Sequence, residues 1–190
     1  TIQRKAAVIT AASPSRTYGD NVPAVTWSYS GLVNGENGDA ILTGSPNCST
    51  TYVSTSAFGT SPTTTCTGAT AANYTFSYGG GSVAIAKRPI TVTASSPTVT
   101  YGDSIPSITP SYSAFQNGET SSVVSSTSCA TTYTPTSAVA TTPTTTCSGA
   151  SAANYSFSYT GGAVTIQRKG LTVTASSPTV TYGDAVPTIT

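Results

Sequence analysis

The residues of this sequence that could do chemistry are few. Its 190 residues include four cysteines, six acids, seven bases and no histidine. General acid–base and nucleophilic catalysis rest on a positioned histidine, a pair of carboxylates or an activated nucleophile. Most of the acids here stand beside glycines, in Tyr-Gly-Asp and Asn-Gly-Glu, where a carboxylate more often closes a turn through its own backbone. We expect no enzyme activity and no cofactor, and we keep a calcium site as the alternative use of these acids.

The cysteines form two pairs of equal spacing. Cys48 and Cys66 are 18 residues apart, and so are Cys129 and Cys147. Four cysteines allow three pairings, and only Cys48–Cys66 with Cys129–Cys147 keeps each bridge local. Zinc or redox chemistry would need histidines or a Cys-x-x-Cys spacing. We therefore predict two structural disulfides, each worth about 3 kcal/mol for a loop of this size, and a location outside the cytoplasm.

The chain repeats itself. Tyr-Gly-Asp occurs three times, at spacings of 83 and 81 residues, and the stretch Ala72–Tyr78 returns as Ala153–Tyr159. Repetition at a fixed period is typical of tandem structural units. We expect the triplets to form structural turns, at Tyr18, Gly19, Asp20, Tyr101, Gly102, Asp103, Tyr182, Gly183 and Asp184.

Basic pairs mark where one repeat passes into the next. We assign residues 1–4 to the end of a preceding repeat, 5–86 to the first full repeat, 87–167 to the second and 168–190 to the start of a third. Both ends are expected to be cuts through a longer protein. The predicted joints contain no Gly/Ser linker, and they hold six of the seven bases: Arg4, Lys5, Lys87, Arg88, Arg168 and Lys169.

The pattern inside a repeat is that of β-strands with one buried and one exposed face. Ile90, Val92 and Ala94, for example, alternate with threonines, and a period of two indicates a half-buried strand. We predict a mostly β fold built of tandem small β domains, with at most one helical turn, at Asn34–Leu42. The repeated tyrosines are expected to lie mostly in the cores, with their hydroxyls at the rim.

The order of these features resembles a known family. Lys/Arg-x-Ile/Leu-Thr-Val-Thr-Ala leads to Tyr-Gly-Asp, then to Val/Ile-Pro, Asn-Gly-Glu, Ala-Asn-Tyr-Thr/Ser-Phe-Ser-Tyr, Gly-Gly and Val-x-Ile. This order is similar to the MBG domain of YGX type, which stands in tandem in large extracellular bacterial proteins, including adhesins. The resemblance implies a bacterial cell-surface setting, no catalytic residues, and a fold akin to the β-grasp of mucin-binding repeats. An immunoglobulin-like sandwich is the alternative fold.

Composition favours a structural role. Charged residues make up 7 % of the chain and the net charge is +1, which gives no basis for binding nucleic acid or an anionic membrane. No apolar run reaches the roughly 20 residues that span a bilayer. We expect an extended, stiff spacer in a secreted bacterial surface fibre or adhesin stalk. Its expected partners are neighbouring repeats and, through lateral or head-to-tail association, other copies in a filament.

Two other functions stay open. The repeats themselves could be adhesive modules that bind mucin, a glycan or another cell-surface glycoprotein through exposed tyrosines or Trp27. Because Trp27 aligns with Pro110, a site built on it would not recur in the second repeat. Ice binding by threonine-rich faces would need a regular threonine ladder, which Thr64-Thr65 and Thr91-x-Thr93 do not form.

Overall fold

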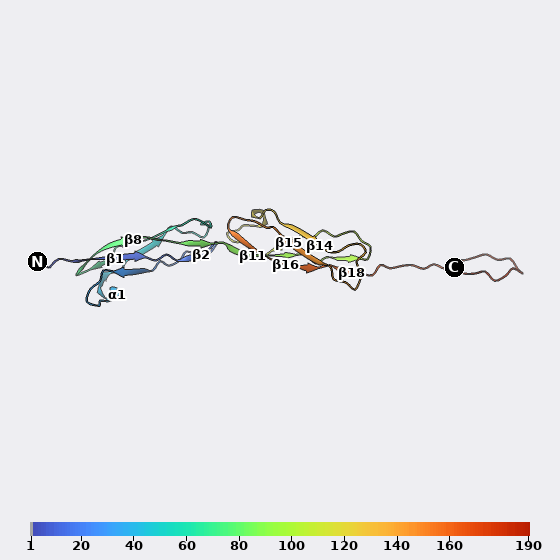
Figure 1. Cartoon of the computed structure of the whole chain (residues 1–190), viewed down its shortest axis with the longest axis horizontal. Coiled ribbons are helices and arrows are strands. Elements are labelled where there is room, and N and C mark those ends of the chain that lie inside the picture. Colours follow the sequence, from blue (N-terminus) through green and yellow to red (C-terminus); the bar gives the residue numbers. More distant parts are fainter. Residues whose placement is uncertain (1) are drawn as a thin grey trace.

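Two tandem β units make up most of the chain. The computed structural model describes residues 2–190 and is almost all β, as the sequence predicts (Figure 1). We call residues 5–86 unit 1 and residues 87–167 unit 2. Unit 1 contains β1 (Lys5–Ala11), β2 (Ser15–Thr17), β3 (Trp27–Ser30), α1 (Gly38–Ile41), β4 (Leu42–Gly44), β5 (Asn47–Thr50), β6 (Thr63–Thr67), β7 (Thr70–Ala71), β8 (Tyr74–Gly79), β9 (Gly81–Ser82) and β10 (Ala84–Ala86). Unit 2 contains β11 (Arg88–Ala94), β12 (Thr98–Thr100), β13 (Pro110–Tyr112), η1 (Ser121–Val123), β14 (Ser128–Thr131), β15 (Thr144–Ser148), β16 (Tyr155–Thr160), β17 (Gly162–Ala163) and β18 (Thr165–Gln167).

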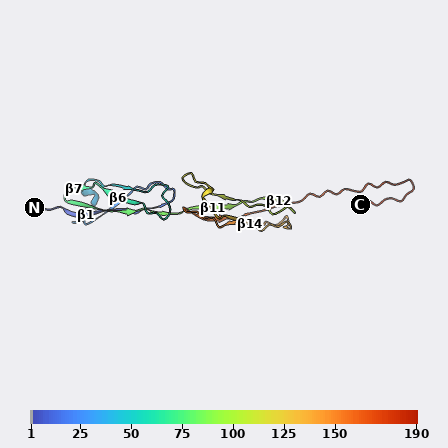
Figure 2. The same ribbon diagram turned by 90° about the horizontal axis from the view of Figure 1, so that it is seen from above.

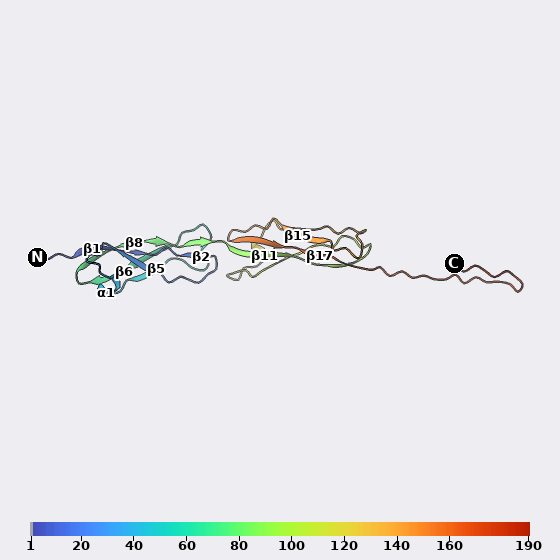
Figure 3. The same cartoon turned by 60° about the horizontal axis from the view of Figure 1, so that its bottom comes forward.

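The strand order is nearly the same in both units. In unit 1, β1 lies between antiparallel β3 and parallel β8, and β2 pairs in parallel with β10. A second sheet has the order β5-β6-β9, of which Figure 3 labels β5 and β6. β4 pairs with β7. Unit 2 repeats this as β13-β11-β16, β12-β18 and β14-β15-β17, with the β4–β7 pair reduced to a bridge between Ser125 and Ser151. The parallel pairs distinguish the fold from a sandwich of two purely antiparallel sheets.

The first strand of each unit is the centre of its sheet. In β11, Ile90, Val92 and Ala94 are buried and the threonines between them are exposed, so that one face packs on the core and the other meets solvent. β1 shows the same alternation. Threonine suits the exposed face because its branched side chain fits a pleated surface.

Each unit has an apolar cluster at its head, near its N-terminal end, one in its middle and one at its tail. The head cluster of unit 1 is Ala7, Ala71 and Tyr74. The middle clusters contain the disulfides, with Cys66 in unit 1 and Cys147 in unit 2. The tail cluster of unit 2 comprises Val99, Tyr133, Val164 and Ile166.

The tail of unit 1 and the head of unit 2 form one cluster. Its buried members are Tyr18, Tyr52, Val83 and Ile85 from unit 1 and Ile90 and Tyr155 from unit 2. This cluster joins the two predicted β domains at their boundary, so their cores are not separate there. The reason is geometric: β10 ends at Ala86 and β11 begins at Arg88, so only one residue separates the two apolar ends.

The helical turn is short and lies where it was predicted. α1 has four residues, and Asn37 begins it by accepting a hydrogen bond from the Asp39 amide. In unit 2 the corresponding segment is two residues shorter and forms only the 3₁₀ turn η1. None of the helices within residues 2–190 has the length and apolar character needed to cross a bilayer.

Residues 168–190 extend beyond unit 2 without forming a strand (Figures 1 and 2). They nevertheless make the local hydrogen bonds of a unit's first segment. The Ser176 amide donates to the Thr190 carbonyl at 2.9 Å, and the corresponding Ser95 amide donates to the Thr109 carbonyl at 3.0 Å. This segment therefore has the local geometry of the start of a unit. Within the described part of the chain, it has no partner strands equivalent to β13 and β16, which pair with β11 in unit 2.

Candidate functional site: the joint between the units

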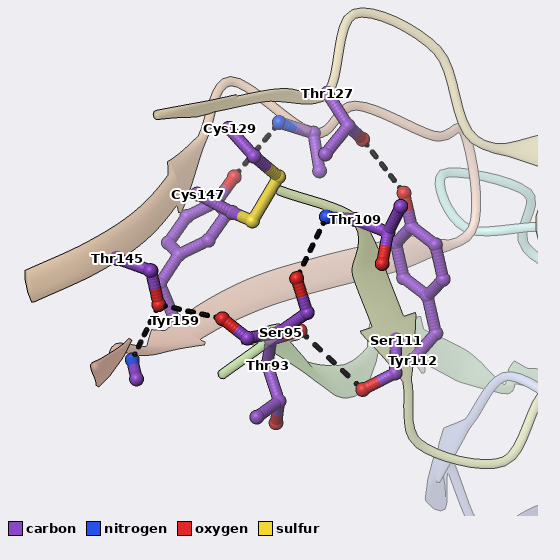
Figure 4. Close-up of a disulfide and its surroundings, with 12 residues drawn as sticks. Thr93, Ser95, Thr109, Ser111, Tyr112, Thr127, Cys129, Thr145, Cys147 and Tyr159 are labelled. Carbon is purple, nitrogen blue, oxygen red and sulfur yellow. Dashed lines mark hydrogen bonds between the residues drawn. A yellow bond between two sulfur atoms is a disulfide. The ribbon is translucent and has the colours of Figure 1, made fainter. Parts of the chain in front are cut away.

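Both predicted disulfides are present, one in each unit. Cys48 pairs with Cys66, and Cys129 with Cys147. Each bridge joins directly opposed residues of a hairpin, β5 with β6 and β14 with β15, at the end away from the hairpin loop. Figure 4 shows the second bridge with Tyr159, Thr145 and Ser95 around it. The bridges fasten each unit internally and take no part in contacts between units.

The Tyr-Gly-Asp triplets form the same turn in all three copies. The carboxylate of Asp20 accepts a hydrogen bond from the Thr17 amide at 2.9 Å, and Asp103 and Asp184 do the same three residues back along the chain. The glycine has a φ of +85° in the first turn and similar values in the others, in the left-handed region that glycine enters without a steric penalty. The acids thus close turns.

Tyr18 of the first turn crosses into unit 2. Its hydroxyl donates to one carboxylate oxygen of Glu119 at 3.0 Å, and the Tyr155 hydroxyl donates to the other at 2.5 Å. The rings of Tyr18 and Tyr155 meet edge to face with centroids 5.5 Å apart, and Phe115 meets Tyr155 in the same way. Burial, together with the hydrogen bond to Glu119, raises the pKa of Tyr155 to about 12. One carboxylate therefore holds two tyrosines from two units.

Arg88, at the start of β11, binds the same Tyr-Gly-Asp turn. Its Nη2 lies 2.5 Å from a carboxylate oxygen of Asp20, and its Nε donates to the Tyr18 carbonyl at 2.6 Å. The two side chains of the ion pair are 24 % and 38 % exposed, so solvent screens the charge attraction. The pair's main effect is to fix the orientation of the turn against β11.

A second loop of unit 1 also contacts unit 2. The Phe58 amide donates to the side-chain oxygen of Asn154 at 3.0 Å, and the Asn117 side-chain amide donates to the Ser54 carbonyl at 3.1 Å. The Lys87 ammonium lies 5.2 Å from the centre of the Phe58 ring, within the range of a cation–π contact. The joint thus rests on two separate loops of unit 1.

Gly19 lets the two units approach closely. A Cβ at this position would lie 2.6 Å from the Gln116 side chain, whereas one at Gly102 would meet nothing within 4 Å. The same turn is therefore packed against a neighbour in the first copy and open in the second.

The joint uses only some of the predicted joint and turn residues. Lys87 and Arg88 are half-buried in contacts between the units, while the other four joint bases are exposed: Arg4, Lys5, Arg168 and Lys169. Tyr101 is 44 % exposed and Tyr182 fully so, so neither lies in a core. Sequence reasoning missed Glu119, Asn117 and Asn154. The available signal was that the same residue types recur in the first unit, as Glu36, Asn34 and Asn73. Such recurrence is equally expected of residues that only form turns.

A shallow hollow on unit 1 contains the single tryptophan. It has a volume of about 240 Å³ and is lined by Thr26, Trp27, Tyr29 and Asp39. The Trp27 indole donates to the Tyr29 hydroxyl at 2.7 Å, which donates to Asp39 at 2.8 Å. Unit 2 has Pro110 at the tryptophan position. No cluster of three metal-binding side chains gathers among residues 2–190.

The comparison with known families agrees with the repeat. A family model described as MBG domain (YGX type) matches residues 7–84 and again residues 90–165. The searches among curated proteins and among solved structures find no match. The two matched stretches leave out residues 85–89, where the chain passes from one unit into the next.

Proposed function

Because this chain belongs to the MBG domain family of YGX type, in two tandem copies, we propose that it is a spacer segment of an extracellular bacterial surface protein. In this role it is a stiff rod that holds other parts of the protein away from the cell, as a stalk or within a filament. The observation that carries the proposal is the joint, where a single residue, Lys87, separates the last strand of one unit from the first strand of the next.

The contacts at the joint supply the reason for stiffness. Bending would have to separate Tyr18 from Glu119 and also Phe58 from Asn154, because the two contacts come from different loops. It would also expose the apolar cluster that both units share, and exposing apolar surface costs free energy in proportion to its area. A flexible Gly/Ser linker would make no such contacts and would not resist bending.

Two further features fit a surface location. Disulfides persist in oxidising compartments and are rare in the cytosol, and every described cysteine is bridged. Each unit has only about eighty residues, a size at which a staple compensates for limited core burial.

Small-angle X-ray scattering tests the proposed stiffness. Four residues, Gly-Ser-Gly-Ser, are inserted between Ala86 and Lys87, and the same four between Val139 and Ala140 as the control, in an exposed turn at the tail of unit 2. We expect the unmodified chain and the control to give one narrow distribution of unit-to-unit distances, and the joint insertion to broaden it. A distribution for the unmodified chain as broad as that of the joint insertion would contradict the spacer function.

A second candidate function has one observation in its favour. The Trp27 hollow combines an indole, a phenol and a carboxylate in a fixed hydrogen-bonded chain, which are groups that could stack on and hydrogen-bond a sugar ring. The chain has only one tryptophan, so its fluorescence reports on this hollow alone. A glycan array followed by fluorescence titration tests glycan binding. Saturable quenching in the unmodified chain that is lost in Asp39→Asn would support it, and Trp27→Ala, which has no indole left to report, should lose its signal on the array.

A further inference from the structure

The tail end of unit 2, together with the residues that follow it, repeats the surface at which unit 1 passes into unit 2. A hollow of about 360 Å³ lies there, lined by Tyr101, Val139, Arg168, Lys169 and Leu171. In the repeat, these positions correspond to Tyr18, Phe58, Lys87, Arg88 and Ile90. All five counterparts lie in the joint between units 1 and 2. We call the five residues around this hollow the tail face.

Exposure separates the two copies of this surface. Tyr18 is 4 % exposed and Ile90 1 %, whereas their counterparts Tyr101 and Leu171 are 44 % and 88 % exposed. The turn itself is unchanged, because Asp103 closes it as Asp20 does. What differs is the surroundings: Tyr18 and Ile90 pack with Tyr155 and Phe115 of unit 2, and nothing within residues 2–190 covers Tyr101 and Leu171 in this way.

The head of unit 1 has the glutamate and tyrosine arrangement that the head of unit 2 uses at the joint. The Tyr74 hydroxyl donates to Glu36 and accepts a hydrogen bond from the Val33 amide, as Tyr155 does with Glu119 and Gln116. In the joint, the second oxygen of Glu119 receives Tyr18. Among residues 2–190, the corresponding oxygen of Glu36 receives no hydrogen bond. The glutamate and tyrosine of a head are thus hydrogen-bonded to each other even where no tail contacts them.

We propose that the tail face is a binding surface for the head of a further MBG unit, which repeats the joint contact by contact. The Tyr101 hydroxyl donates to a glutamate at the Glu119 position of that unit, and Lys169 pairs with Asp103. The Val139 amide donates to an asparagine at the Asn154 position. This inference rests on the joint alone and holds whether the units serve as a spacer or bind a glycan.

Chain continuity decides which unit can occupy the face. At the joint, β11 pairs with β16 and β13 of the same unit, and residues 169–175 occupy the corresponding place beyond unit 2. A unit of another molecule already has its own first strand there, so both strands could not take one position. The occupant is therefore an MBG unit whose first strand is residues 169–175 of this polypeptide.

An extended chain tests the proposal. Thr190 corresponds to Thr109 in the repeat, so we append a second copy of residues 110–167 directly after Thr190, which completes a further unit from residues 168–190. Nitration of tyrosines by tetranitromethane, mapped by peptide mass spectrometry, then reports the accessibility of Tyr101. Tyr78, which is 38 % exposed on unit 1, is the internal control because its peptide is unique and lies away from both end faces.

We expect Tyr101 to be nitrated about tenfold or more slowly in the extended chain than in the 190-residue chain, since reaction then requires the new joint to open. Tyr78 should react equally in both. Replacing the appended copy of Glu119 by Gln should restore part of the reactivity of Tyr101. Formation of a third disulfide shows that the added unit has folded.

Equal nitration of Tyr101 in both chains, with the third disulfide formed, would overturn the proposal. A second extension with residues 27–86 of unit 1 provides a different head on the same first strand. Failure of both extensions to form the third disulfide would also count against the proposal, because the tail face would then accept neither head. The spacer function is tested separately by scattering and does not depend on this result.

Discussion

At the scale of single residues, the shared carboxylate of Glu119 is the centre of the joint. It accepts hydrogen bonds from Tyr18 of one unit and Tyr155 of the other. Hydrogen bonds to a charged group are stronger than those between neutral groups, and both tyrosines are buried. A side chain in a turn, which by sequence looks like a loop residue, therefore joins two units.

Removing one hydroxyl tests this arrangement. Tyr18→Phe should lower the free energy of unfolding, measured in urea, by roughly 1 to 2 kcal/mol, because it deletes a hydrogen bond to a charged acceptor at a buried position. Tyr101→Phe is the matched control, since Tyr101 is the same residue in the same turn with no head against it. Equal effects of the two substitutions would show that the bond across the joint contributes nothing.

The tyrosine at the centre of the joint also predicts a pH dependence. Burial raises the pKa of Tyr155 to about 12, above the ordinary value near 10. The unfolded chain therefore loses this proton first as the pH rises, and stability falls with increasing pH between about 10 and 12. Urea unfolding across this range should show the decline, and Tyr155→Phe should reduce it. A stability that rises over this interval would contradict the assignment.

At the scale of elements, the disulfides fasten hairpins. Cys66 and Cys147 are almost fully buried beside the first strand of their unit, in the middle clusters. Each bridge therefore fastens the two strands of a hairpin within the second sheet, and its buried cysteine packs against the first strand of the unit.

Loss of a bridge should affect one unit. Cys48→Ala with Cys66→Ala should lower the stability of unit 1 by about 3 kcal/mol in the chain-entropy model and separate the thermal transitions of the two units in calorimetry. The same pair of changes at Cys129 and Cys147 should produce the mirror result, with unit 2 melting first. A single shared transition, shifted equally by both variants, would mean that the joint makes the two units one cooperative body.

At the scale of the whole molecule, one glycine controls how closely the units approach. Gly19→Ala and Gly102→Ala share the strain of a left-handed backbone, of order 1 kcal/mol or more. Only Gly19→Ala also forces Gln116 away. Scattering should therefore show a wider distribution of unit-to-unit distances for Gly19→Ala and an unchanged one for Gly102→Ala. Unchanged distances in both variants would show that the contact with Gln116 does not set the joint.

The sequence predicted the architecture better than the joint. Strand periodicity, equal cysteine spacing and the repeat were enough for the β fold, the two bridges and the turn of Tyr-Gly-Asp, because these features depend on local pattern. The contacts of Glu119, Asn117 and Asn154 could not be read in this way. They depend on how the turns of one unit face the loops of the other. The period of a sequence repeat does not give the distance between such residues in space. The shared apolar cluster was missed for the same reason.

The parallel pairing of β2 with β10 has a mechanical consequence. β2 follows the first strand of unit 1 and β10 is its last strand. Their parallel ladder runs along the long axis of the chain. A load applied to both ends pulls the two strands past each other, so that the ladder bonds must break together rather than one after another. β12 and β18 form the equivalent parallel pair in unit 2. In each unit, therefore, a pulling force loads this ladder in shear.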